Sequence, residues 1–423
     1  MTMQGLLKCE VCGKITMIKI GVSFSSTTHQ IFIPCKNCDT LFFGFYNQND
    51  ETVEIKTTFI NAEDVSSEKI KPDYICTISR DFLSQKIFDY EKPEDTITFP
   101  EWMKFKNRIG DECYRQLFNN VEALNNSASQ AIHEYTRVMN LWFNSNFDLL
   151  ASQLAYFLDA DKNNIPLKTE QNYLSAIRRL TISLTKDAFF GDEFDDFMEE
   201  SKNFISTLYT TRPEEIKRYL EKLEELDLFK RIEKLIFDRI KAFYVYVPDL
   251  TPVFSLLYLS ENERKLLFEP LCTFGTFTTS FEHIKPFYID NFETIIKTLT
   301  LPLGLNNILK RGDFNIFGDP SISDLVVFNN IEISYNKMKH IESGSFLTSE
   351  IDGILDNKLR NSIGHCDYQV NNLTQTISYN KSRTSIALSS VGYSTYKQFL
   401  YLLKTFYITT LLHEAYYEFR AKA

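Results

Sequence analysis

The pattern of apolar and polar positions changes near residue 100. Before it, short runs rich in β-branched and aromatic residues, such as IKTTFI at 55–60 and TITFP at 96–100, lie among polar turn-forming stretches and predict strands. From about 101 to 245, apolar residues recur three and four positions apart, as in RRLTISLTKDAFF at 178–190, which predicts helices. The sequence therefore predicts a β-rich N-terminal part and a mostly helical remainder.

The clearest helical run spans 214–244, where Thr211 can cap its start and Pro213 suits its first turn. Pro248 and Pro252 follow in VPDLTPVF, and we expect them to end this helix and mark a domain boundary.

The rest of the chain again has a helical pattern, except for DYQVNNLTQTISYNKSR at 367–383, which predicts a small hairpin between helices. The fold class expected is α+β. We expect three consecutive domains, which are a β-rich zinc-ribbon domain at 1–100, a helical middle region at 101–252 and a helical domain with a short hairpin at 253–423.

Composition agrees with a folded protein, because 43% of the 423 residues are hydrophobic and 24% are charged. The opening MTMQGLLKCEVCG lacks the basic start and apolar run of a signal peptide. The most apolar helical candidate, Phe399 to Leu412, is interrupted by Lys404 and two threonines, so we expect no membrane span. We expect a cytoplasmic protein in a reducing compartment, where paired cysteines bind metal more often than they form disulfides.

The net charge of −10 and the pI of about 5.3 argue against a chain that coats nucleic acid through bulk charge. The charge is uneven, however. Acidic residues concentrate between Asp187 and Glu200, and basic residues outnumber acidic ones from Lys381 to the end. This distribution is compatible with a local basic face near the C-terminus.

Two C-x2-C pairs, separated by 22 residues, predict one tetrahedral metal site with four thiolate ligands, the environment that structural Zn²⁺ prefers. The four predicted ligands are Cys9, Cys12, Cys35 and Cys38. Gly13 follows the first pair, where positive φ is needed. We expect ITMIKIGV and HQIFIP, between the pairs, to form a β-hairpin.

A closed four-thiolate shell has no open position, so we expect the zinc to be structural. A redox dithiol or an iron site is the alternative. The ribbon itself could be a structural staple or could contact nucleic acid or a protein. The other cysteines lack ligand spacing and are expected in the core; they are Cys76, Cys113, Cys272 and Cys366.

The stretch EIDGILDNKLRNSIGHCDY at 350–368 predicts a helix that buries Ile351, Leu355 and Leu359. Asn361 and His365 lie four residues apart on another face, close enough for the amide to orient the imidazole.

Arg360 lies about 140° around the helix from His365, so its side chain would have to reach around or meet the His of a second copy. Gly364 weakens the helix, which predicts that His365 lies at its end, exposed to a cleft. On spacing alone, Asp356 and Arg360 could instead form a surface ion pair, with His365 as a helix cap.

The segment RNSIGH, late in a helix and followed by a hairpin and a final amphipathic helix, resembles the HEPN superfamily. Members carry an Arg, usually a polar residue next, and then a His; here these are Arg360, Asn361 and His365. Many members have Gly after the His, whereas this chain has Cys366. The resemblance covers the last 100 to 170 residues. Together with the zinc ribbon, it is similar to effectors of prokaryotic abortive infection and antiviral defence.

The resemblance implies a HEPN-like helical bundle, a homodimer in which two Arg–His motifs meet, and metal-independent cleavage of RNA. Imidazole can remove the proton of an RNA 2′-hydroxyl, and guanidinium can stabilise the charge that develops on the phosphoryl oxygens. The products would carry a 2′,3′-cyclic phosphate and a 5′-hydroxyl, and DNA would survive.

We therefore expect an endoribonuclease that acts as a toxin-like antiphage effector, with a phage-derived trigger or regulatory partner. The alternatives are a non-catalytic HEPN-like dimerisation or binding protein and a zinc-ribbon regulator that binds nucleic acid.

Overall fold

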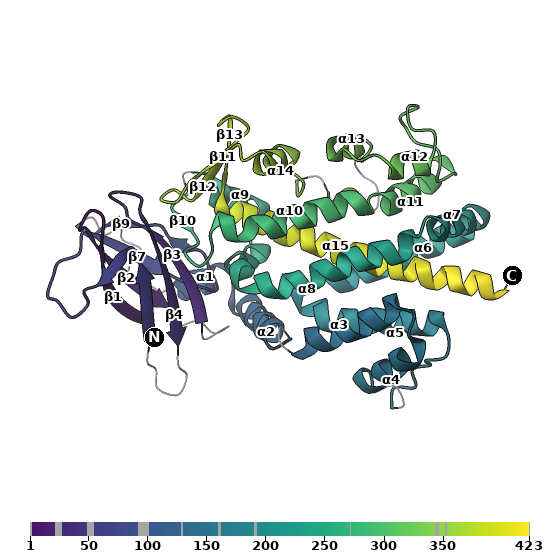
Figure 1. Cartoon of the computed structure of the whole chain (residues 1–423), viewed down its shortest axis with the longest axis horizontal. Helices are drawn as coiled ribbons and strands as arrows, with labels where there is room; N and C mark the ends of the chain where they lie inside the picture. The colour runs from purple at the N-terminus through teal and green to yellow at the C-terminus, as the bar shows by residue number, and fades with distance from the viewer. Residues whose placement is uncertain are drawn as a thin grey trace. The chain divides into compact units, whose positions relative to one another are not determined.

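The computed structural model describes residues 2–21, 28–48, 55–91, 101–127, 130–159, 162–189, 193–270, 272–342, 347–351 and 353–422. Strands occupy its N-terminal part and helices most of the remainder, which confirms the α+β class (Figure 1). The strand predicted at 96–100 lies outside the described residues.

The chain forms two compact units, each assembled from separate segments. Unit 1 comprises Met1–Asn125, Tyr246–Tyr288 and Lys358–Tyr396, and unit 2 comprises Asn126–Val245, Ile289–Asn357 and Lys397–Ala423. The three consecutive domains expected from the sequence are thus not the division that the structure has.

The strands before residue 90, apart from β8, build two sheets of unit 1, and β8 pairs with the later strand β10 (Phe274–Gly275) in a two-stranded sheet. They are β1 (Thr2–Cys9), β2 (Ile15–Gly21), β3 (Thr28–Pro34), β4 (Leu41–Gln48), β5 (Ile55–Ile60), β6 (Ala62–Asp64), β7 (Tyr74–Ile78), β8 (Ser84–Gln85) and β9 (Phe88–Asp89). One sheet has the order β6-β1-β2-β7-β9 and the other the order β3-β4-β5. Asn61, with φ of 69°, turns the chain from β5 in one sheet into β6 in the other.

Both sheets contribute to one apolar core. Ile18 and Ile20 on β2 and Ile31 and Ile33 on β3 belong to the same buried cluster. Their spacing of two residues places them on one face of each strand. Each fully buried side chain of this kind stabilises the fold by about 1.5–3 kcal/mol relative to an exposed one.

The expected hairpin of β2 with β3 is wrong, because the two strands lie in different sheets. Instead β1 pairs with β2, and β3 pairs with β4, both antiparallel. The physical reason is that each C-x2-C segment is itself a hairpin turn. The partner strands are therefore TMQGLLKC and LFFGFYNQ, which lie on the outer side of each cysteine turn.

The remaining elements of unit 1 include a further three-stranded sheet and several short helices. They are α1 (Glu101–Ile109), α2 (Asp111–Ser127), η3 (Ser255–Tyr258), α9 (Glu261–Phe268), β10 (Phe274–Gly275), α14 (Asn357–Gly364), β11 (Tyr368–Asn371), β12 (Thr376–Tyr379) and β13 (Thr384–Ala387). The hairpin predicted at 367–383 is confirmed as β11 and β12, and β13 adds a third strand. The side chain of Gln375 fixes this sheet to β10, because it accepts a 2.7 Å hydrogen bond from the Thr276 N–H and donates a 2.6 Å bond to the Thr276 carbonyl.

Unit 2 is helical. Its helices are α3 (Gln130–Phe143), α4 (Phe147–Phe157), α5 (Glu170–Thr185), η2 (Lys186–Ala188), α6 (Glu193–Thr211), α7 (Pro213–Glu225), α11 (Thr300–Arg311), α12 (Leu325–Asn329) and α13 (Ser334–Met338). Three long helices are divided between the two units, α8 (Leu228–Phe254), α10 (Phe281–Thr298) and α15 (Leu388–Lys422), and the last two residues of α2 and the first of α14 also belong to unit 2.

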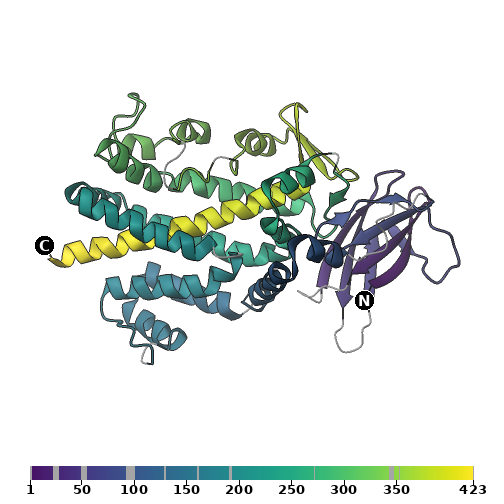
Figure 2. The ribbon, with the colours of Figure 1, turned by 180° about the vertical axis from the view of Figure 1, so that it is seen from behind.

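The last helix is not amphipathic as expected. All residues of α15 from Phe399 to Thr410 are buried. A helix that is apolar all round belongs in the interior of a protein, and α15 runs beside α8 in both views (Figures 1 and 2). Phe399 stacks on Phe243 of α8 at 3.9 Å between ring centroids, and the buried Lys404 pairs with Glu350 at 2.9 Å.

Pro248 and Pro252 do not end the preceding helix, because both lie inside α8. Buried side chains in its last turns, among them Val247 and Leu250, hold these turns in the core although the prolines lack N–H donors. The predicted run 214–244 is instead divided at Asp227, whose φ is 51°, into α7 and α8. Arg212, not Thr211, is the N-cap residue of α7. No helix in the described ranges is long and apolar enough to cross a membrane.

Candidate metal centre and candidate active site

The four paired cysteines converge although they come from hairpins in two different sheets. The sulfur of Cys9 lies 3.6 Å from that of Cys38, and the sulfur of Cys12 lies 3.5 Å from that of Cys35. All four sulfurs lie within 4.8 Å of one another. Zn–S bonds of about 2.3 Å would place tetrahedral sulfurs about 3.8 Å apart. The cluster therefore has the dimensions of a four-thiolate metal site and could bind a metal ion.

The two C-x2-C turns follow the same backbone path. The N–H of Gly13 donates to the Cys9 carbonyl at 2.9 Å, and the N–H of Asp39 donates to the Cys35 carbonyl at 2.8 Å. Gly13 has φ of 71°, as predicted, and Asp39 has φ of 58°. Glycine adopts this left-handed conformation freely and aspartate tolerates it better than most residues, so each turn ends on a residue suited to it.

Burial and hydrogen bonding give the thiols different acidities. Burial raises the pKa of Cys35 to about 12 and also raises the pKa of Cys9. Hydrogen bonds with Thr40, first through its hydroxyl, lower the pKa of Cys38 to about 6. A divalent cation binds thiolates, so metal binding at this cluster would release protons.

The other cysteines fit their expected core role unevenly. Cys76 is fully buried, and burial raises its pKa. Cys113 and Cys272 are only partly buried, and Cys366 is exposed. The prediction was therefore wrong for Cys366. It has φ of 54° and directly follows α14 and His365, so its side chain leaves the packed face of the helix.

The second candidate site is the end of α14. This helix begins at Asn357, later than the sequence pattern indicated, and Ile351 lies buried in the turns before it. The N–H of His365 still bonds to the Asn361 carbonyl at 2.9 Å, so His365 completes the last turn. His365 is exposed, and a Cβ added at Gly364 would meet nothing within 4 Å. The imidazole thus lies at an open helix end, as predicted, and the cleft expected beside it stays a prediction.

The side chain of Asn361 contacts Arg360 and not His365. Nη1 of Arg360 donates a 3.1 Å hydrogen bond to Oδ1 of Asn361. Within the part of the chain that the structure describes, the His365 imidazole makes no hydrogen bond. The expectation that Asn361 orients this imidazole is therefore replaced by a different geometry, in which Asn361 holds the guanidinium.

Three polar clusters were not anticipated from the sequence. Nδ1 of His283 lies 3.0 Å from the Asp249 carboxylate. Nδ1 of the buried His413 lies 2.7 Å from Glu233, and Glu233 also accepts a 2.9 Å hydrogen bond from the indole of Trp142.

In the third cluster, the Tyr368 hydroxyl donates to Glu282 at 2.8 Å and accepts from Lys285 at 2.7 Å. The contacts named in these clusters join residues that are between 34 and 180 positions apart in sequence, so no local spacing could have indicated them.

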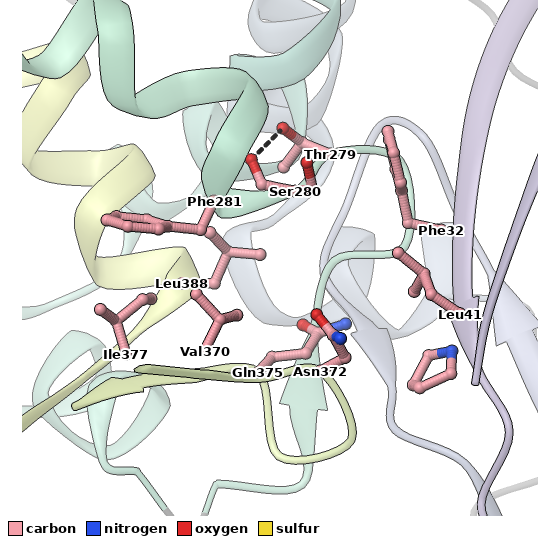
Figure 3. A pocket seen from close by; sticks show the side chains of 11 residues that line it. Phe32, Leu41, Thr279, Ser280, Phe281, Val370, Asn372, Gln375, Ile377 and Leu388 are labelled. Carbon is pink, nitrogen blue, oxygen red and sulfur yellow. Dashed lines mark hydrogen bonds between the residues drawn. The ribbon is translucent and has the colours of Figure 1, made fainter. Parts of the chain in front are cut away.

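A small pocket lies between the β3–β4 hairpin and the β11–β12 hairpin (Figure 3). The side chains of Phe32, Phe281 and Leu388 line it together with the aliphatic Val370 and Ile377. It holds about 20 Å³, which is room for about one water molecule. This pocket is therefore too small to bind a nucleotide.

Comparisons of the chain with protein-family models, with curated proteins and with solved structures find no match.

Proposed function

We propose that this chain is a metal-independent endoribonuclease of the HEPN type, with Arg360 and His365 as catalytic residues and Asn361 as the residue that positions Arg360. The observation that carries the proposal is the end of α14, where an exposed His365 follows an Arg360 whose guanidinium is held by its neighbour. Cleavage of RNA by attack of its own 2′-hydroxyl needs two groups. One is an imidazole that no other residue occupies, and the other is a guanidinium held in place.

In the proposed reaction, His365 removes the proton of the 2′-hydroxyl, and the 2′-oxygen attacks the adjacent phosphorus. The bond from phosphorus to the 5′-oxygen breaks, and this oxygen takes a proton from a general acid. Arg360 stabilises the charge on the phosphoryl oxygens, because its planar fork matches two of them. The atoms balance as a 2′,3′-cyclic phosphate and a 5′-hydroxyl, with no metal or water consumed.

The acid is proposed to be His365 of a second copy of the chain. Because His365 is exposed, a single chain leaves this Arg–His pair open to water, and the reaction also needs a second proton-transfer group. A homodimer that brings two such helix ends together would supply both. We propose a toxin-like antiphage effector of this kind, controlled by a phage-derived trigger or regulatory partner.

For the cysteine cluster, we propose Zn²⁺ as the bound ion, in a structural role. The sulfur spacing and the all-thiolate donor set support zinc, and four protein ligands leave no position for a substrate or a reactive water.

The test is cleavage of total RNA by the purified full-length chain, with and without EDTA, followed by identification of the end groups. His365→Ala and Arg360→Ala should each reduce cleavage by about 100- to 10,000-fold, the usual contribution of general acid–base catalysis. Asn361→Ala should cost less, because water can replace part of its contact with Arg360. EDTA should not inhibit at short times.

His133→Ala is the matched control, because His133 is also exposed and lies on α3 of unit 2. It should cleave like the wild type. In cells, expression of the wild type should slow growth and expression of His365→Ala should not. Equal toxicity or equal cleavage by His365→Ala would reject the catalytic role and favour a non-catalytic binding protein.

A further inference from the structure

The turn between β12 and β13, residues 380–383, is attached to the end of α14. The Asn380 N–H donates a 3.0 Å hydrogen bond to Oγ of Ser362, and the Lys381 N–H donates a 3.3 Å bond to Oδ2 of Asp367. Ser362 lies three residues before His365 and Asp367 two residues after it. The turn is therefore held from both sides of the proposed catalytic histidine.

The backbone of this turn is unusual. Asn380, Lys381 and Ser382 have φ of 53°, 56° and 59°, so three consecutive residues adopt the left-handed conformation. For residues other than Gly and Asn this costs roughly 1–2 kcal/mol each. Left-handed residues are common in tight turns between antiparallel strands, and this conformation persists because its surroundings hold it. The restraint is the two hydrogen bonds that the turn donates to Ser362 and Asp367, together with the 3.2 Å bond from the Arg383 N–H to the Asn380 carbonyl.

The turn exposes two cations. Lys381 and Arg383 are exposed, and in the described part of the chain neither forms an ion pair. Many other cations of this acidic protein are paired, as Lys285 is with Glu282 and Arg311 is with Glu342. Asp367, the acid beside the turn, directs one carboxylate oxygen at the backbone of Lys381. Two cations without an ion pair thus lie on a turn whose backbone is bonded to Ser362 and Asp367, the residues that flank His365 in the sequence.

We propose that the turn at 380–383 binds the phosphate backbone of single-stranded RNA and holds the strand against the Arg360–His365 end of α14. The identity of this ligand rests on the ribonuclease function proposed above. Arg383 offers a planar fork that matches two phosphate oxygens, and Lys381 offers a point charge. Asp367 is a positioning residue, because it acts on RNA only through the turn.

The experiment measures binding of a short fluorescent single-stranded RNA by anisotropy, at several salt concentrations, to the full-length His365→Ala chain. Each phosphate contact contributes about 0.7 to the slope of log K against log salt for single strands. Lys381→Ala with Arg383→Ala should therefore lower the slope by about 1.4 and weaken binding about 25-fold at 0.1 M salt. Lys202→Ala with Lys234→Ala, at exposed positions of α6 and α8, is the matched control and should change neither quantity.

Two further variants test the restraint on the turn. Asp367→Ala keeps both cations but removes the acceptor for the Lys381 N–H, so it should weaken binding, whereas Asp367→Asn keeps an acceptor oxygen and should restore it. Circular dichroism confirms that each variant is folded. An unchanged slope and affinity in the Lys381 and Arg383 double variant would overturn the proposal.

Failure of the proposed role of the turn can be distinguished from failure of the proposed ribonuclease function. Cleavage that depends on His365 but has the same KM in the Lys381 and Arg383 double variant would overturn the role of the turn and leave the enzyme. Binding that depends on the turn, in a chain with intact His365 that cleaves no RNA, would support the turn and reject the enzyme.

Discussion

His283 and His413 each contact a carboxylate that lies far away in the sequence. His413 is fully buried, is stacked on Phe229 at 4.5 Å between ring centroids and binds Glu233. Neither pair was predicted, because the fold alone brings the partners together. The metal cysteines were predicted, because a C-x2-C turn fixes the distance between its sulfurs locally. Only the approach of the two C-x2-C turns to each other depends on the fold.

The His283–Asp249 pair predicts a pH-dependent stability. The hydrogen bond with Asp249 raises the pKa of His283 above its usual 6.5. Its stabilisation is therefore fully present below pH 6.5 and is lost as the pH rises through the raised pKa. His283→Gln should lower the free energy of unfolding more at about pH 5.5 than at about pH 9, by at most about 1 kcal/mol, because 44% of the His283 side chain is exposed.

Urea unfolding at both pH values measures the difference, with the exposed His133→Gln as the control. The nearby Arg80 does not confound it, because burial lowers the pKa of Arg80 only to about 10 and leaves it charged in this range. An equal loss at the two pH values would show that the ion pair contributes nothing to stability.

Among the elements, those with a strong local pattern were predicted best. β5, the hairpin at 367–383 and the helical character of 214–244 followed from periodicity and turn residues. The pairing of β2 with β3 was wrong, because sequence order does not determine which strands share a sheet. The helix end predicted at Pro248 and Pro252 was wrong, because packing of the apolar side chains of α8 outweighs the hydrogen bonds lost at the two prolines.

The cysteine turns predict that metal removal destabilises both sheets, since Cys9 and Cys35 belong to the core cluster that β2 and β3 share. Elemental analysis of the purified chain should give one zinc, and Cys35→Ser should lose it. Zinc binding contributes free energy of folding, so metal-free protein should unfold at a lower temperature. Cys272→Ser, at a partly buried cysteine outside the cluster, should keep both the metal and the melting temperature. A wild-type chain without metal after gentle purification would contradict a zinc site.

For the whole molecule, the buried position of α15 changes where a dimer can form. The aromatic run from 396 to 419 offers apolar side chains that could line an interface or fill a core, and the burial of residues 399–410 assigns that part to the core. A second copy therefore cannot dock on residues 399–410. In the proposed reaction, the general acid comes from a second copy of the chain, so the dimer should form at the open end of α14.

The dimer prediction can be tested at this surface with a natural reporter. Cys366 directly follows His365 and is exposed, whereas Cys113 and Cys272 are partly buried. If two α14 ends meet, the two Cys366 thiols come close together, and a short bis-maleimide should link the chains into a covalent dimer. Light scattering at micromolar concentration should give twice the chain mass. Cys366→Ser should stay dimeric by light scattering but lose the crosslink, because the serine hydroxyl does not react with maleimide.

A wild type that is monomeric by light scattering and is not crosslinked, with or without RNA, would contradict a catalytic site shared between two chains. A dimer without a Cys366 crosslink would place the interface elsewhere, and His365 would then have to find its general acid within its own chain.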